Sequence, residues 1–208
     1  EWSETVEIDY TVSFQTQDNI RDYYKKTKDA FREDSLWGQT MLRWNPADKH
    51  SLAFGLEGSY SEFGRENLAL KPDTTNSLPS EWGTSEYAAL TEYQWNMNDD
   101  WTMFLGGRLD KHQYTDYGFS PRIALIHHLT EKDTLKFSVA KSLRINNAKD
   151  MRKTYLKSGA DSDFEKIINW ELRWEHNYDD QLKFALTTYY NDMDLNAIGN
   201  NGRNEHVA

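Results

Sequence analysis

The sequence predicts an all-β chain, arranged as a long antiparallel up-and-down meander. Apolar and other residues alternate with period two, most of the segments that do so are long, and the connections between them alternate between short and long. We expect nine strands, at about 4–16, 35–45, 49–63, 85–97, 100–113, 117–129, 133–144, 166–178 and 180–194. Most exceed the five or six residues that are usual in soluble sheets.

The stretch from Phe119 to Arg144 shows this alternation most clearly. Ile123 and Leu125 alternate before the polar turn LTEKD, and Leu135, Phe137 and Val139 alternate after it. One side of each strand is therefore apolar, while the other is small or charged. Such an apolar side faces either a protein core or lipid, and strand length favours lipid because about nine to eleven residues cross a bilayer.

The connections differ between the two ends of the predicted meander. NPADK, NMNDD, HLTEKD and NYDDQ are short and rich in turn-forming residues, whereas 17–34, 64–84, 145–165 and the tail from 195 are long. Short turns at one rim and long loops at the other are typical of outer-membrane barrels. A soluble β-sandwich is the alternative.

Aromatic residues cluster near the predicted strand ends, where they would form two girdles at the membrane interfaces. Beside the short turns lie Trp44, Trp95, Trp101, Trp174 and Tyr178; near the opposite ends lie Tyr60, Phe63, Tyr87, Tyr114, Phe119, Tyr189 and Tyr190. A sandwich also has aromatic residues at strand ends, so this pattern favours the membrane without excluding the alternative.

Composition excludes several classes of function. The net charge of −10 makes nucleic acid an improbable partner, and the absence of Cys excludes disulfide and thiol chemistry. The mean hydropathy is −0.89, and no apolar run is long enough for a transmembrane helix. A chain that crosses a membrane with strands would show the same profile, because only every second residue faces lipid.

An ordered set of segments resembles the barrel of TonB-dependent outer-membrane receptors. The set comprises Leu42 to Gly64, Glu86 to Trp95, Gly107 to Asp110, Ser120 to Arg144 and Asn169 to Asp192. The sequence departs from the family pattern at three places. These are RINN at 144–147, SGADSDFEKI at 158–167, and His127, where Tyr is usual. These departures affect the expected ligand class more than the expected fold.

The resemblance implies that 1–208 is an internal part of a barrel of about 22 strands, without the plug domain or the barrel termini. We therefore expect an open, curved sheet with two unpaired edges. It also implies an outer-membrane location and partners in membrane lipid, the plug, the remaining strands and, through the plug, the TonB complex. The implied function is TonB-energised uptake of a scarce ligand such as a ferric siderophore, haem or cobalamin. The alternative is a soluble all-β module that binds a ligand or carbohydrate.

The segment 144–159 carries the clearest local features. Asn147 is placed to cap a short helix that ends near Lys157, with Gly159 as its stop. Five cations lie in or beside this helix: Arg144, Lys149, Arg152, Lys153 and Lys157. They suggest an extracellular site for an anionic metal chelate or for lipopolysaccharide phosphates; a solvated loop helix is the simpler interpretation.

We therefore predict ligand contacts in extracellular loops at Trp82, Arg144, Asn147, Arg152 and Tyr155, with Trp82 in the loop 64–84. We expect no catalytic residues, no metal ligands and no cofactor, because no hydrolase, zinc, P-loop or EF-hand motif is present. The paired His127 and His128 point to opposite faces of a strand and cannot chelate one ion.

Overall fold

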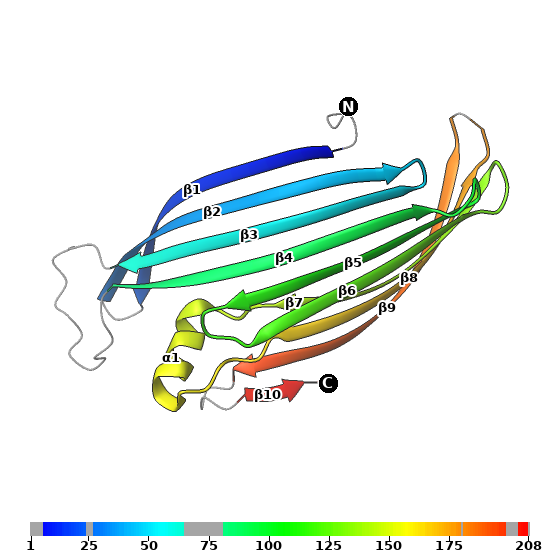
Figure 1. The fold of residues 1–208 in the computed structure, drawn as a ribbon. Helices are drawn as coiled ribbons and strands as arrows, with labels where there is room; N and C mark the ends of the chain where they lie inside the picture. Colours follow the sequence, from blue (N-terminus) through cyan, green and yellow to red (C-terminus); the bar gives the residue numbers. More distant parts are fainter. Residues whose placement is uncertain (1–5, 24–26, 65–80, 180, 199–203, 208) are drawn as a thin grey trace.

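The computed structural model describes residues 6–23, 27–64, 81–179, 181–198 and 204–207. They form one antiparallel sheet in which spatial order equals sequence order (Figure 1). The strands are β1 (Val6–Tyr23), β2 (Thr27–Ala47), β3 (His50–Gly64), β4 (Trp82–Asn96), β5 (Trp101–His112), β6 (Tyr117–His128), β7 (Asp133–Arg144), β8 (Glu165–Asn177), β9 (Lys183–Ile198) and β10 (Asn204–Val207). The helix α1 (Ala148–Ser158) lies between β7 and β8 in sequence.

The predicted meander is confirmed, and all nine predicted strands are present as β1 to β9. Their ends lie within about four residues of the prediction, except for the end of β1 and the start of β2. The prediction was wrong about the segment 17–34, which is no long loop: β1 extends to Tyr23 and β2 begins at Thr27. This extension is polar at most positions, so it lacks the apolar alternation that reveals a half-buried strand. The tail from 195 likewise extends β9 and adds β10 as a tenth strand. Most of the predicted loop 64–84, residues 65–80, lies outside the described residues.

The strand register places the apolar residues on one face of the sheet, which we call the apolar face. One cross-strand row runs through Met103, Leu125, Phe137 and Leu172, and the next runs through Leu105, Ile123, Val139, Trp170 and Tyr190. Successive rows on this face are two residues apart, as the pleat of a strand requires. The apolar residues of β5, β8 and β9 therefore share one side of the sheet.

No second layer covers the apolar face in the part of the chain that the structure describes. Large side chains there are open to the surroundings, for example Leu56 at 68% of its full exposure. The buried apolar residues among those described are only Ala88, Tyr114, Met151 and Phe164. A soluble sandwich would bury its apolar face between two sheets. The sandwich alternative is therefore wrong, and the open sheet matches the predicted fold.

The opposite face, which we call the polar face, carries ion pairs between strands. Arg43 of β2 pairs with Asp9 of β1, and Arg122 of β6 pairs with Glu92 of β4. Lys136 lies 2.9 Å from a carboxylate oxygen of Glu175 on the neighbouring strand. Charges at mid-strand on this face are compatible with a watery interior, as in outer-membrane barrels.

Short turns close the rim at one end of the sheet. The Asn98 side chain accepts hydrogen bonds from the backbone N–H groups of Asp100 and Trp101, and Asp179 does the same for Gln181 and Leu182. These Asx contacts explain why Asn and Asp were reliable turn signals in the sequence.

The aromatic positions follow the two predicted girdles only in part. Trp101 stacks on His127 beside the short turns, with 3.8 Å between ring centroids. At the other end Phe63 and Tyr189 lie on the polar face, and Tyr114 is buried. The prediction was wrong about these three residues. Position in the sequence indicates how far along a strand a ring lies, but it does not show which face of the sheet the ring is on or what covers it.

Among the described residues, no helix has the length and apolar character needed to cross a bilayer.

Candidate functional site

The helix α1 is set by two local signals. The Asn147 side chain accepts a hydrogen bond from the Lys149 backbone N–H at 2.9 Å, which satisfies one free donor of the first turn. At the other end Gly159 has φ of 70°, and its N–H donates to the Tyr155 carbonyl at 2.7 Å. Glycine adopts this left-handed conformation without strain, so the predicted cap and stop are both confirmed.

One side of α1 packs on the rim of the sheet. Met151 is 2% exposed, and the ring of Tyr155 lies 5.4 Å from that of Tyr114 in the β5–β6 turn. The Arg152 guanidinium lies over the Trp82 ring, 5.0 Å from its centroid, and Arg152 is only 9% exposed. A cation desolvated against an indole in this way contributes attraction as well as contact area. The helix is therefore attached to the rim at three side chains.

A buried polar pair supports this attachment. The backbone N–H of Tyr114 donates to Nδ1 of His112, so the ring proton belongs on Nε2, which donates to Thr84 Oγ1 at 2.8 Å. His112 lies beyond the apolar band, and burial together with the nearby Lys111 ammonium lowers the pKa of its imidazole. A neutral imidazole fits both hydrogen bonds, and it fixes the turn on which Tyr155 rests.

The five predicted site residues have different surroundings. Asn147 caps the helix, and Trp82 and Arg152 pack on each other beneath it. Trp82 is the first residue of β4 rather than a loop residue. The Arg144 side chain is 73% exposed and lies 2.6 Å from a carboxylate oxygen of Glu165, which is itself buried. Tyr155 is partly exposed. The structure thus brings Trp82, Arg152 and Tyr155 together at α1 and leaves Arg144 beside them.

The predicted basic patch divides into buried and exposed parts. Arg152 is covered and Arg144 has Glu165 as a partner, whereas Lys149, Lys153 and Lys157 are exposed. These lysines are four residues apart, so they share the side of α1 that faces away from Met151 and Tyr155. The helix therefore presents three cations to the surroundings.

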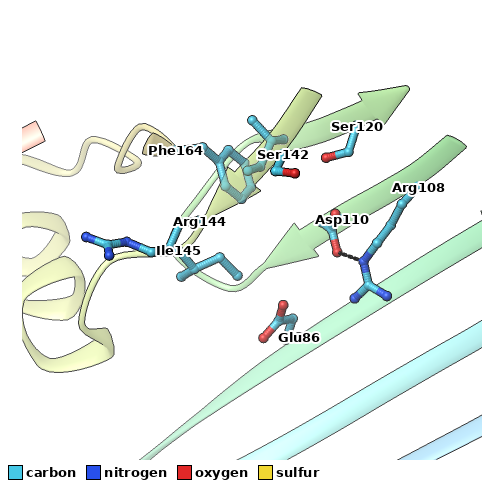
Figure 2. Close-up of a pocket in the computed structure, with 9 residues that line it drawn as sticks. Glu86, Arg108, Asp110, Ser120, Ser142, Arg144, Ile145 and Phe164 are labelled. Atoms are coloured by element: carbon cyan, nitrogen blue, oxygen red, sulfur yellow. Dashed lines mark hydrogen bonds and ion pairs between the residues drawn. The ribbon is translucent and has the colours of Figure 1, made fainter. Parts of the chain in front are cut away.

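A cavity of about 400 Å³ lies on the polar face beside this helix (Figure 2). Its lining includes Glu86, Arg108, Asp110, Ser120, Ser142, Arg144, Ile145 and Phe164. Arg108 donates two hydrogen bonds of 3.0 Å to Glu57 and one of 2.7 Å to Asp110. Its charge is thereby balanced within the wall. Figure 2 shows the Arg144 side chain pointing away from this cluster.

The cavity coincides with a gap in the strand pairing. β6 and β7 are paired from Arg122 and Ala140 to the rim of short turns. From there toward the rim of long loops, these two strands are not paired with each other. Phe164 fills this gap: a Cβ atom on Gly118 would come within 2.8 Å of its ring. Ser162 forms a parallel bridge with Thr115, and its N–H donates to the Tyr114 carbonyl. The segment after α1 thus completes the wall.

The cavity was not predicted as a site from the sequence. Arg108 and Asp110 entered the prediction only as part of the family-like segment Gly107 to Asp110. Their i, i+2 spacing was a usable signal, because it puts both side chains on one face of a strand. Nothing local in the sequence indicated that Glu86 of β4 and Phe164, which precedes β8, would meet Arg108 and Asp110 at one cavity.

Comparisons with known proteins agree with this architecture. Residues 1–205 match the family described as TonB dependent receptor-like, beta-barrel. The chain is 22% identical over 203 residues to the iron-regulated outer membrane virulence protein of Vibrio cholerae serotype O1, covering 93% of the chain and 29% of that protein.

Solved structures show the same fold at low identity. A mutant of the ferric enterobactin receptor PfeA of Pseudomonas aeruginosa gives a TM-score of 0.69 at 17% identity, over 93% of this chain and 33% of that one. The FrpB iron transporter of Neisseria meningitidis gives 0.72 at 14% identity, over 94% and 36%. The copper transporter OprC gives 0.70 at 15% identity, over 92% and 36%. The chain thus spans about a third of the length of the relatives it matches.

Proposed function

Because the chain belongs to the TonB-dependent receptor β-barrel family, we propose that it forms part of the wall of a complete outer-membrane receptor. In that receptor a plug and further strands would complete the barrel, and the TonB complex would deliver energy through the plug. The receptor would take up a scarce ligand, with a ferric siderophore as the first candidate and haem or cobalamin as others. The main support is the family match together with the exposed apolar face.

The exposed side of α1 is the best candidate for the first contact with ligand. The cavity cation Arg108 is balanced by Glu57 and Asp110, so the cavity itself offers no net positive charge. Lys149, Lys153 and Lys157 are exposed, and Arg144 is the most open cation beside the cavity. An anionic chelate would be attracted to these side chains, because a group of positive charges raises the local concentration of anions.

The predicted site residues then have two roles in this proposal. Arg144 and Tyr155 would contact ligand directly, because both are at least partly exposed. Asn147, Arg152 and Trp82 would act by holding α1 in place, through the cap and the buried cation–π contact. The relatives include siderophore, iron and copper proteins by name, so fold alone does not select the ligand.

The test uses the complete receptor in detergent, with ferric enterobactin, haem and cobalamin as probes. Hydrogen bonds to charged groups contribute about 1.5–3 kcal/mol, so Arg144→Ala should weaken binding of an anionic probe about tenfold or more. Arg152→Ala should also weaken it, but with faster hydrogen exchange in 148–158. Lys132→Gln, at the opposite rim, is the matched control. Unchanged affinity in both arginine variants would remove this site from the proposal.

A further inference from the structure

The apolar face contains a second, larger hollow, on the opposite side of the sheet from the cavity beside α1. Its volume is about 860 Å³, and it is lined almost entirely by apolar groups of β2 to β6. Ala89, Thr91 and Gly107 form its floor, and Phe54, Leu105 and Phe119 form its walls. Pockets of about 300–1,000 Å³ are the usual size for a bound small molecule.

Side-chain size along the register explains why this hollow exists. Thr91 and Gly107 are cross-strand neighbours, and Phe54 is the next neighbour of Thr91 in the same row. Two small residues thus follow a large one across three strands. The Phe119 ring leans over Gly107, where a Cβ atom would come within 3.0 Å of it. The ring closes one side of the hollow and leaves the floor open to the membrane.

A polar row lies directly above the hollow on the same face. Tyr87, Lys111 and Tyr117 are cross-strand neighbours, two residues beyond the row of Ala89, Leu109 and Phe119. Tyr87 and Tyr117 are exposed. The Lys111 ammonium lies 5.5 Å from the centroid of the Tyr117 ring and donates to the Thr115 carbonyl. Asp161 lies 4.0 Å from it, so one ammonium with three donors is not saturated by these contacts.

We propose that the hollow and this row form a binding site for one anionic phospholipid of the membrane. An acyl chain occupies the hollow, and its phosphate headgroup accepts hydrogen bonds from Lys111 and the two tyrosines. The hollow is continuous with the lipid-facing surface, so acyl chains are the molecules that meet it. The apolar hollow and the cationic row beside it also match the order of groups in a phospholipid, in which an anionic phosphate is attached to apolar chains. An acyl chain held in the hollow makes dispersion contacts with the lining side chains, which these side chains lack when the hollow is empty.

The test measures lipid retained by the complete receptor after detergent purification, using native mass spectrometry. Phosphatidylglycerol and phosphatidylcholine are the probes. Thr91→Leu fills the floor with a side chain that lipid tolerates, so it should remove one retained lipid. Thr188→Leu makes the same change on the apolar face of β9, far from the hollow, and should retain that lipid. Equal retention by Thr91→Leu and the wild type overturns the proposal.

The headgroup contact has its own test. One lysine at a membrane surface contributes about 1 kcal/mol to binding of anionic lipid, so Lys111→Gln should reduce the preference for phosphatidylglycerol about fivefold. Lys132→Gln, at the rim of short turns, should leave that preference unchanged. An unchanged preference in Lys111→Gln overturns the proposal. Inorganic phosphate should fail to displace the retained lipid; displacement by phosphate alone would show that the hollow holds no chain, and would overturn it as well.

Discussion

Gly118 shows how one missing side chain allows the wall to close. It lies in β6 where pairing with β7 has ended, and the space that its side chain would occupy is filled by Phe164 and Leu143. An added Cβ would lie 2.6 Å from a Leu143 methyl carbon and 2.8 Å from the Phe164 ring. Real Cβ atoms do not approach carbon so closely, so either Phe164 leaves the gap or the strands move apart.

We therefore predict that Gly118→Ala loosens the segment that follows α1. Overpacking a filled site costs about 1–3 kcal/mol, and here the cost falls on the docking of Phe164. Limited proteolysis of the complete receptor should cut within 145–164 several times faster than in the wild type. The control is Gly38→Ala, where the nearest heavy atom to an added Cβ is 3.8 Å away. Equal cleavage rates in the two variants would contradict this account of the gap.

At the scale of one element, α1 depends on its caps because it is short. Helices of fewer than about 12–15 residues are marginal in water by themselves, and α1 has 11 residues. Its stability comes from Asn147, from Gly159 and from the packing of Met151 and Arg152. Three lysines at i, i+4 spacing on the exposed side oppose it, since like charges at that spacing repel.

Asn147→Ala should consequently increase the local opening of α1. Loss of an N-cap costs about 0.5–2 kcal/mol, which predicts hydrogen exchange about 2- to 30-fold faster in 148–158. Asn147→Asp keeps the acceptor and should exchange at a rate near that of the wild type. Hydrogen exchange with mass spectrometry on the complete receptor measures both. Slow exchange in Asn147→Ala would mean that rim packing alone maintains the helix.

Features that depend on residues close together in the sequence were predicted correctly, whereas features that depend on distant residues were not. The cap at Asn147, the stop at Gly159 and the turns at Asn98 and Asp179 were predictable because a residue and its near neighbours determine them. The strand extension into 17–34 was not, because both of its faces are largely polar. The gap between β6 and β7 and the cavity beside it depend on Phe164, which lies more than 40 residues along the chain from Gly118, the residue of β6 that it packs on. No local pattern records such a contact.

For the whole molecule, the decisive property is that the sheet has edges. Among the described residues β1 pairs only with β2, and β9 pairs on its outer side only through the four residues of β10. In the part of the chain that the structure describes, the outward-pointing backbone N–H and C=O groups of these edges have no partner in the sheet. Water would satisfy them, but lipid does not, and each unsatisfied group in lipid costs several kcal/mol.

We predict that residues 1–208 alone do not insert into a membrane as a stable monomer. The edge groups make the inserted open sheet much less stable than a closed barrel, in which every edge is paired. The measurement is mobility on a detergent gel with and without heating, after refolding into detergent micelles. The complete receptor should migrate as a compact species that heating unfolds, whereas the 208-residue chain should migrate identically under both conditions. A compact, heat-sensitive monomer of the short chain would contradict the premise that the strands require barrel closure.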